Sequence, residues 1–344
     1  MEKWERNLAR CITSPEELSG LFRLDSSALS EVVARYPMRI TPYYLGLIEE
    51  TGDAIWRQCV PDPAELCDHI QSPDPLDEER LSPVPGLIHR YPDRVVWIAS
   101  SACAVYCRFC MRKRGVGCPG MAPAPQDESI AYIAAHPEIR DVILSGGDPL
   151  LLHDDQIDAI LTRLRKIPHV EIVRIGTRTP ATLPERITPK LVRMLKRHHP
   201  LYLNTHFNHP REITPQAAKA CAMLADAGIQ LGNQTVLLKG VNDDPAIMRT
   251  LMRRLLAIRV RPYYLHQMDL VKGTAHFRTP VAQGVAVLEA LRGHTSGLAV
   301  PHYVIDLPGG KGKVEVPSGR MTRDGSSLMV ENYLGESIPY QDLP

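Results

Sequence analysis

Short apolar segments alternate with amphipathic segments along most of this chain, and this alternation is the strongest constraint on its fold. Six apolar segments predict strands at 95–99, 141–144, 171–175, 201–205, 230–237 and 261–266. The last five begin about 30 residues apart, and predicted helices follow the strands at 127–135, 155–166, 189–197, 215–227, 245–258 and 281–292. A repeat of this length is typical of βα units, whose strands lie parallel in one sheet.

Six such units are fewer than the eight of a closed barrel, so we expect an α/β fold built on an open, partial (β/α)6 barrel. Residues 1–88 have helical periodicity broken by prolines, with Ser14 and Glu17 as a capping box at one helix start. A proline-rich link at 72–85 is expected to lie over the following domain. The predicted parts are a helical segment with its link (1–88), the partial barrel (89–295) and a C-terminal segment (296–344).

Three of the eight cysteines, Cys103, Cys107 and Cys110, form a C-x3-C-x2-C motif after the first predicted strand. A cubane of four irons needs one protein ligand per iron, so three thiolates leave one iron open to a small molecule. A structural zinc site is the alternative, but it requires a fourth Cys or His, usually from a second paired element. The other cysteines are scattered singly. The motif therefore favours a [4Fe-4S] cluster.

Polar motifs also follow the other predicted strands, where parallel α/β folds gather their reactive groups. After the second strand, Gly146 and Gly147 permit a close backbone approach to a ligand, and Asp148 can accept from an ammonium group, although an ordinary turn is the alternative. Gln234 lies within an otherwise apolar strand and indicates a polar group inside the barrel. The full set of rim motifs is 103–110, 145–149, 177–180, 206–209, 233–234 and 267–269.

Two further groups of residues have alternative interpretations. His206 and His209, at i and i+3, suggest a metal pair, but hydrogen-bonded packing is favoured because no further ligand stands at suitable spacing. The basic run from Arg108 to Arg114 is usually a solvated face, yet beside a cluster loop one arginine can clamp a carboxylate. Near the C-terminus a strand leads into a glycine-rich loop with Lys311 and Lys313, which suits a Schiff base to an aldehyde cofactor or, alternatively, a flexible solvent loop.

The overall charge indicates no nucleic-acid partner, because 40 Lys and Arg residues balance 39 Asp and Glu residues in a chain of 344. No apolar run approaches the roughly 20 residues that cross a bilayer, and the N-terminus lacks the apolar core of a signal peptide. Clustered cysteines are typical of metal-bearing proteins in reducing compartments. We therefore expect a cytoplasmic protein without membrane or nucleic-acid partners.

The motifs together resemble the lysine 2,3-aminomutase family of radical S-adenosylmethionine, pyridoxal-phosphate-dependent enzymes. Besides the cysteine motif with Phe109 before its third cysteine, the resemblance rests on 82–87, 89–94, 144–148, 204–210, 261–264, 273–279 and 292–297. It implies a radical SAM partial barrel, a [4Fe-4S] cluster, S-adenosylmethionine and pyridoxal 5'-phosphate. It also implies an isomerase that moves an amino group from C2 to C3 of an amino acid.

The resemblance assigns roles to individual residues. Lys313 matches the lysine that carries pyridoxal phosphate, with Lys311 where glycine is usual. Arg112 matches the clamp for the substrate carboxylate, and Asp269 and Asp306 match the pair that holds the ε-ammonium. The cysteines are the cluster ligands, and the implied cofactor contacts are Tyr91, Gly146, Gly147, Asp148, His206 and Gln234.

Paired carboxylates select a cationic side chain, so L-lysine, converted to β-lysine, is the favoured substrate. Arginine, or the same chemistry serving β-lysylation of a translation elongation factor, is the alternative. Longer family members have a cysteine-rich zinc tail, which is missing here, and Asp244 stands where a further zinc ligand would lie, so we expect no zinc. The resemblance further implies a reducing electron donor such as flavodoxin or ferredoxin, and a homo-oligomer.

Overall fold

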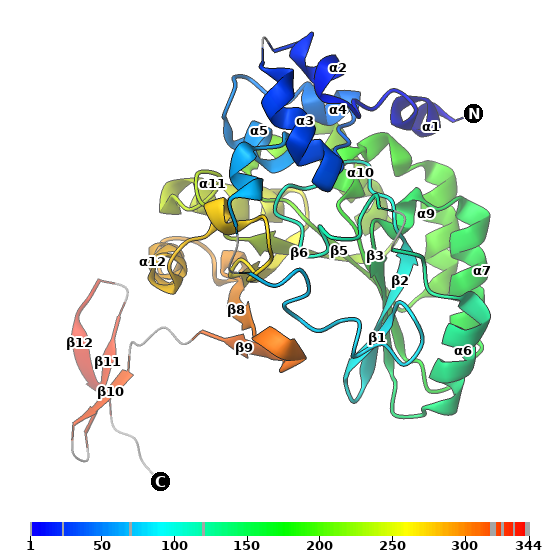
Figure 1. Ribbon diagram of the computed structural model, residues 1–344. Coiled ribbons are helices and arrows are strands. Elements are labelled where there is room, and N and C mark those ends of the chain that lie inside the picture. Colours follow the sequence, from blue (N-terminus) through cyan, green and yellow to red (C-terminus); the bar gives the residue numbers. More distant parts are fainter. Residues whose placement is uncertain are drawn as a thin grey trace.

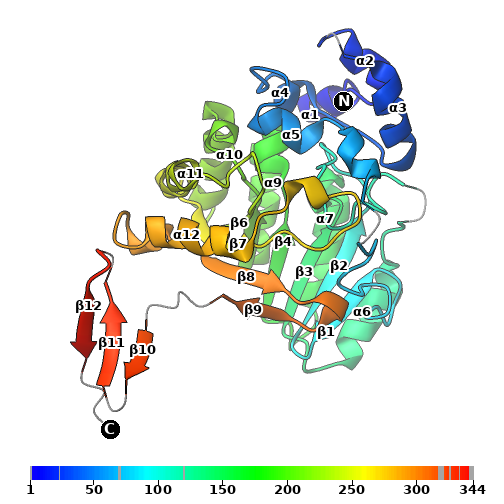
Figure 2. The same ribbon diagram turned by 60° about the vertical axis from the view of Figure 1, so that its left-hand side comes forward.

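The computed structural model describes residues 2–22, 24–68, 71–118, 121–316, 321–324, 327–332 and 334–340. Within these residues, nine strands form one sheet in the order of the chain, from β1 to β9 (Figures 1 and 2). Strands β2 to β8 are parallel, and β1 and β9 pair antiparallel at the two edges. The strands are β1 (Leu87–Tyr91), β2 (Arg94–Ser100), β3 (Asp141–Gly146), β4 (Ile172–Gly176), β5 (Leu201–Thr205), β6 (Gln230–Val236), β7 (Arg261–His266), β8 (His302–Asp306) and β9 (Lys313–Glu315).

Six helices of 7 to 13 residues follow β2 to β7 and cover the outer face of the curved sheet (Figure 1). Several begin with the same local signal: Thr188, Thr214 and Asp244 each cap a helix whose first residue is proline. The expected partial barrel of six βα units is confirmed, and β8 adds a further parallel strand. The helices are α6 (Gln126–Ala135), α7 (Asp154–Arg165), α9 (Pro189–Leu195), α10 (Pro215–Asp226), α11 (Pro245–Ala257) and α12 (Val281–Leu291).

The connections between these elements contain short helical turns. They are α8 (Thr179–Thr182), η2 (Pro149–Leu151), η3 (Pro184–Arg186), η4 (Lys196–His198), η5 (Pro210–Glu212), η6 (Ala275–Phe277), η7 (Gly297–Ala299) and η8 (Pro308–Gly310). Most of these turns follow the carboxyl ends of strands, so they determine how the loops of that rim are arranged.

The two faces of the sheet differ in chemistry. Residues such as Leu144, Ile175 and Leu203 point toward the helices and are buried in the main core. The alternate residues of the same strands face the concave side and are only half-buried, and many of them are polar. The concave side therefore offers a polar surface over the middle of the sheet, which includes Ser145, Arg174, Asn204, Gln234 and His266.

The N-terminal helices form a second, smaller core around Leu18, Ile40 and Tyr44, which also receives Val105 from the cysteine loop. The predicted capping box is confirmed, because the Ser14 hydroxyl accepts from the Glu17 N–H and the Glu17 side chain accepts from the backbone of Ser14. The elements are α1 (Lys3–Leu8), α2 (Pro15–Ser19), α3 (Ser26–Arg35), α4 (Pro42–Leu45), α5 (Ala54–Cys59) and η1 (Pro63–Leu66).

The proline-rich link lies over the barrel, as expected. The Ser72 carbonyl accepts from the Lys272 N–H (3.0 Å), and the Pro75 carbonyl accepts from the Gly309 N–H (2.8 Å). The link therefore contacts both the loop after β7 and the glycine-rich loop after β8.

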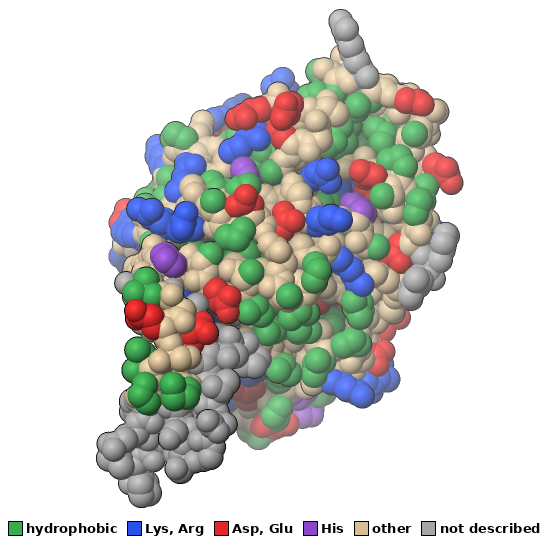
Figure 3. Space-filling view, turned by 90° about the vertical axis from the view of Figure 1, so that its left-hand side faces the viewer, with side chains coloured by type: hydrophobic (Ala, Val, Ile, Leu, Met, Phe, Trp, Pro, Cys, Tyr) green, Lys and Arg blue, Asp and Glu red, His purple; other side chains and the backbone are tan. Residues whose placement is uncertain are grey.

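Beyond β9, a small antiparallel sheet of β10 (Met321–Asp324), β11 (Ser327–Glu331) and β12 (Ser337–Tyr340) lies apart from the main sheet (Figures 1 and 2). Strands β8 and β9 belong to the main sheet although they fall within 296–344, and the three-part division stays a prediction. No helix in the described ranges is long and apolar enough to cross a membrane. Acidic and basic side chains are mixed on the face drawn in Figure 3.

We predict that Gly284→Ala lowers the free energy of unfolding by about 1–3 kcal/mol, the usual cost of overpacking a core. A Cβ at Gly284, in α12, overlaps the ring of Tyr303 on β8. That ring cannot move aside cheaply, because it is buried and its hydroxyl donates to Gln267 Oε1 (2.6 Å). Urea unfolding measures the effect. The matched control is Gly297→Ala, whose Cβ meets nothing within 4 Å; equal stability of the two variants contradicts this packing account.

Candidate active site

The cysteine loop connects β2 to α6 and places Cys103, Cys107 and Cys110 near one another. All eight cysteines are described and are free thiols. Burial raises the pKa of Cys110 to about 11, and the neighbouring Cys107 adds to the rise. Within the described residues, no three His, Cys, Asp or Glu side chains converge closely enough to hold a single metal ion. A four-iron cluster binds each thiolate at a different iron and so does not need that convergence.

The N-terminal helices hold the cysteine loop in place. The Tyr106 N–H donates to the Arg39 carbonyl and the Arg108 N–H donates to the Gln58 carbonyl, both at 2.9 Å. The Arg108 side chain, 2% exposed, forms a two-pronged pair with Glu65 at 2.9 and 2.5 Å. Two backbone contacts and a bidentate ion pair therefore join the loop to the preceding helices.

Lys113 completes this buried group, since its Nζ lies 2.6 Å from Glu65 Oε2. Burial alone would raise the pKa of Glu65, but Arg108 and Lys113 together lower it below its ordinary value. Burial, reinforced by the Arg108 charge, lowers the pKa of Lys113 to about 7 despite the opposing Glu65.

The basic run is not a solvated face, because all four of its cations pair with acids from earlier in the chain. Arg112 donates to both oxygens of Glu78, at 2.9 and 2.7 Å, and its Nη1 lies 3.3 Å from Ser145 Oγ. Arg114 pairs with Asp74 and Glu79 in the link. One edge of the Arg112 guanidinium thus binds Glu78, and the other edge faces Ser145 at the end of β3. The role of Arg112 as a carboxylate clamp stays a prediction.

The paired glycines after β3 are needed for contact with the cysteine loop. A Cβ on Gly146, whose φ is +119°, overlaps the Ser100 carbonyl oxygen, and a Cβ on Gly147 overlaps Ala102 O. The close approach that the sequence predicts is therefore made, at least in part, by the chain's own backbone. Contact of these glycines with a cofactor stays a prediction.

Asp148 organises the loop after β4. Its carboxylate accepts from the Thr177 hydroxyl (2.7 and 2.8 Å), the Arg178 N–H (2.8 Å) and the Leu150 N–H (3.0 Å). Burial raises its pKa, and these hydrogen bonds oppose the rise. The contact of Asp148 with a cofactor ammonium stays a prediction.

His206, after β5, has a buried Nε2 without a hydrogen-bond partner in the described residues. Its ring lies against Phe109 of the cysteine loop, with centroids 5.6 Å apart. Burial lowers its pKa well below the ordinary value, so the ring is neutral. A neutral, unpartnered nitrogen beside the cysteine loop fits a small-molecule cofactor that completes its hydrogen bonding. By contrast, His209 caps η5 by accepting from the Arg211 N–H (3.3 Å).

Lys313 lies directly opposite Asp306 in the β8–β9 pair. Its Nζ is 2.5 Å from Asp306 Oδ2, 3.3 Å from His266 Nδ1 and 5.1 Å from the ring centroid of Tyr264. Lys311 is exposed. A half-buried amine among polar and aromatic groups fits a lysine that holds an aldehyde cofactor, and it favours Lys313 over Lys311.

Both predicted carboxylates lie near this lysine. Burial would raise the pKa of Asp306, but His266 and Lys313 hold it well below its ordinary value, and Arg90 also pairs with it at 3.2 Å. Burial and the nearby Asp306 raise the pKa of Asp269 to about 7. The two acids therefore interact electrostatically, and the positively charged Lys313 and Arg90 both pair with Asp306.

The remaining predicted residues also have clear positions. Tyr91, at the end of β1, lies beside Gly312, next to Lys313, and the Arg94 guanidinium is 3.9 Å from its ring centroid. Gln234 is half-buried on the concave side of β6. Electrostatic contacts link the cysteine loop to the lysine: the Glu78 carboxylate interacts with Arg112 and Arg90, and it raises the pKa of Asp269.

Comparison with known proteins agrees with this geometry. Residues 97–251 match the Radical SAM superfamily and residues 288–342 match the Lysine-2,3-aminomutase family. An L-lysine 2,3-aminomutase of Clostridium subterminale is 47% identical, covering 99% of this chain and 83% of its own. One from Fusobacterium nucleatum is 48% identical (98% and 82%), and a glutamate 2,3-aminomutase of Clostridioides difficile is 43% identical (99% and 82%).

This chain belongs to the lysine 2,3-aminomutase family of radical SAM enzymes. It is therefore an isomerase of the aminomutase type, and its cofactors are a [4Fe-4S] cluster, S-adenosylmethionine and pyridoxal phosphate. The resemblance inferred from the sequence motifs is confirmed.

Several residues of this aminomutase site were not singled out by sequence reasoning. Arg178 falls in the rim motif after β4 and Arg90 in a motif that supported the family resemblance, but neither was given a role. Glu65 and Glu78 are acids in the N-terminal segment and its link, and nothing in their local sequence distinguishes them from surface acids. The one sequence signal for these acids was the run of four cations from Arg108 to Arg114. Such a run requires acidic partners elsewhere in the chain when it is buried.

We predict that the cofactor-free protein loses less stability with rising pH when Asp269 is replaced by Asn. The folded-state pKa of about 7 lies above the unfolded value of about 4, so the carboxyl favours folding below pH 4 and this contribution is lost up to pH 7. In urea-unfolding measurements at a series of pH values, the free energy of unfolding of Asp269→Asn should rise relative to that of the wild type between pH 4 and 7. The exposed Asp226→Asn is the control, and an unchanged difference across this range contradicts the assignment.

Proposed function

We propose that this protein moves the amino group of L-lysine from C2 to C3 to give β-lysine. The single observation that supports lysine is the pair of acids, Asp269 and Asp306, beside Lys313. Two carboxylates in one enclosed site repel each other, and a cationic side chain relieves this repulsion whereas the carboxylate of glutamate increases it. Family membership alone does not choose between these substrates, because a relative named glutamate 2,3-aminomutase is 43% identical.

The cluster with S-adenosylmethionine supplies the radical that removes hydrogen, and pyridoxal phosphate supplies the ring that delocalises the unpaired electron while the amino group migrates. In this proposal Cys103, Cys107 and Cys110 hold the cluster. Lys313 holds pyridoxal phosphate with Tyr91 beside it. The protein's own contribution is to orient the groups and to exclude water.

The substrate is held at both ends. The Arg112 Nη1, which faces Ser145, binds the α-carboxylate while Glu78 keeps the guanidinium in place. Asp269 and Asp306 bind the ε-ammonium. His206, Gln234, Gly146, Gly147 and Asp148 contact S-adenosylmethionine, and the unpartnered His206 Nε2 supports this placement.

We further propose a cytoplasmic enzyme, since a cluster of this type needs a reducing compartment. A flavodoxin or ferredoxin is the proposed electron donor, and a homo-oligomer is the proposed assembly. An absence of zinc also stays a prediction.

The acid pair predicts the outcome of an anaerobic assay with iron, sulfide, S-adenosylmethionine, pyridoxal phosphate and a chemical reductant. L-Lysine should be converted to β-lysine, identified by chromatography and mass spectrometry. Asp269→Asn and Asp306→Asn should each lower kcat/KM about 10- to 150-fold, since each removes a charged hydrogen-bond partner of the ammonium, worth about 1.5–3 kcal/mol. Glu315→Gln, an exposed acid near Lys313, is the control.

Preferential turnover of arginine, or of glutamate, would refute the lysine assignment. The alternative, in which the same reaction makes β-lysine for attachment to a translation elongation factor, also starts from free L-lysine, so the stereochemistry of the β-lysine produced is determined in the same assay.

A second prediction separates the two lysines of the glycine-rich loop. Reduction of the pyridoxal-phosphate-loaded protein with borohydride, followed by peptide mass mapping, should mark Lys313. Lys311→Gly should retain the label and the activity, because Lys311 is exposed. Lys313→Arg should lose both while keeping the iron content, and labelling at Lys311 in the wild type would contradict the assignment.

A further inference from the structure

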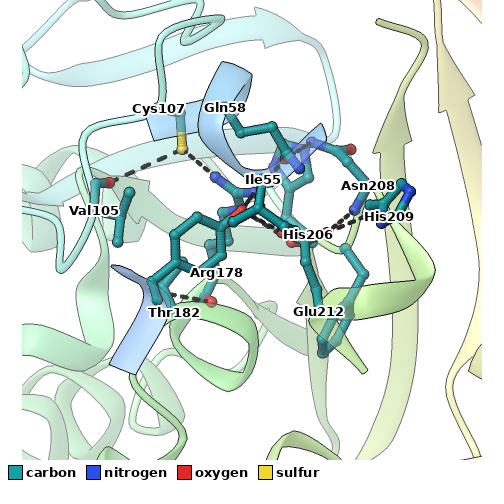
Figure 4. A network of polar contacts seen from close by, with 12 residues as sticks. Ile55, Gln58, Val105, Cys107, Arg178, Thr182, His206, Asn208, His209 and Glu212 are labelled. Atoms are coloured by element: carbon teal, nitrogen blue, oxygen red, sulfur yellow. Dashed lines mark hydrogen bonds and ion pairs between the residues drawn. The ribbon is translucent and has the colours of Figure 1, made fainter. Parts of the chain in front are cut away.

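Arg178 lies behind the cysteine loop and contacts one of the proposed cluster ligands. Its Nη1 is 2.7 Å from Cys107 Sγ, and its Nη2 donates to Glu212 Oε1 and to Gln58 Oε1, both at 2.6 Å (Figure 4). Its Nε donates to the His206 carbonyl at 3.3 Å. The side chain is only 8% exposed, so the guanidinium meets the sulfur in a desolvated setting.

The orientation of the Arg178 guanidinium is set by Glu212, which is itself held by several hydrogen bonds. Glu212 is fully buried, and its Oε2 accepts from the Asn208 and His209 N–H groups at 2.5 and 2.8 Å. Its Oε1 also accepts from the Tyr44 hydroxyl at 2.8 Å. Three donors besides Arg178 thus hold this carboxylate, and it binds one end of the Arg178 guanidinium while the other end is directed at Cys107.

We propose that Arg178 is a positioning residue that raises the reduction potential of the iron–sulfur cluster through a charge-assisted hydrogen bond to Cys107. This inference rests on the proposed ligation of the cluster by the three cysteines. One-electron reduction adds a negative charge to the cluster, and hydrogen bonds to its sulfurs together with nearby positive charge stabilise the reduced form. Glu212 offsets part of the guanidinium charge, but it engages Nη2, whereas the N–H group nearest the sulfur is on Nη1.

The N-terminal helices take part in this arrangement. Gln58, in α5, and Tyr44, in α4, both contact Arg178 Nη2, at 2.6 and 3.0 Å. The helical segment that precedes the barrel thus helps to set the donor on the cluster ligand, in addition to supporting the cysteine loop.

The test is a potentiometric titration of the anaerobically reconstituted protein, without substrate or pyridoxal phosphate, followed by the EPR signal of the reduced cluster. The double variant Arg178→Met/Glu212→Gln removes the donor without leaving a buried charge unpaired. It should lower the ratio of reduced to oxidised cluster at a fixed potential about tenfold, because a hydrogen bond to a charged group contributes about 1.5 kcal/mol or more. This equals a shift of about 59 mV to more negative potential.

Two further variants complete the design. Arg178→Lys keeps a cation beside Glu212, but one ammonium cannot repeat the forked contact, so a smaller shift in the same direction is expected. The matched control is Arg186→Lys. Arg186 is fully buried and pairs with Asp154 at 2.8 Å, as Arg178 pairs with Glu212, but its other donors meet backbone carbonyls and no sulfur. Its replacement should leave the potential unchanged.

Iron content is measured for every variant. An unchanged potential in Arg178→Lys or the double variant at full iron content overturns the proposal and leaves the proposed aminomutase function intact. If the double variant takes up no iron, Arg178→Lys decides alone. If the wild type itself takes up no cluster, the cysteine assignment fails, and the proposed function fails with it.

Discussion

The buried carboxylate of Glu65 is the contact on which the site's architecture depends. It receives both nitrogens of the Arg108 fork and the amine of Lys113, so two cations of the cysteine loop are neutralised by one acid from the N-terminal segment. Breaking such a pair from one side leaves an uncompensated buried charge and costs about 3–5 kcal/mol. The N-terminal helices therefore stabilise the conformation of the cysteine motif, although the motif and the strand before it belong to the barrel.

Ion pairs also hold the proline-rich link in place and connect strands across the open side of the barrel. Glu78 and Asp74 of the link pair with Arg112 and Arg114, and the link carbonyls contact the loops after β7 and β8. Arg90 on edge strand β1 pairs with Asp306 on β8, the strand next to the opposite edge, so a side-chain ion pair links the two sides of an unclosed sheet. Charged side chains thus link segments across the open side of the barrel.

The sequence was sufficient for the parts of this fold that depend on local patterns. The 30-residue repeat located six strands and their helices, and the Ser14–Glu17 capping box was recognisable from four residues. The pairings of charges were not accessible, because Arg108 and Glu65 are 43 residues apart and nothing local identifies the partner. For the same reason the glycines at 146 and 147 signalled a close approach without indicating that the backbone at 100–102 makes it. Edge strand β9 has three residues, too few for a periodic pattern.

The charge distribution around Lys313 bears on the kind of substrate that the site suits. Asp306 has three cationic or hydrogen-bonding neighbours, Lys313, Arg90 and His266, whereas burial and the neighbouring Asp306 raise the pKa of Asp269. In the proposal Lys313 would hold pyridoxal phosphate, and the two acids would remain beside it. A substrate ammonium next to them would add positive charge near Asp269 and so favour its ionised form. A substrate carboxylate would instead add a third negative charge, which is why the acid pair favours a basic amino acid.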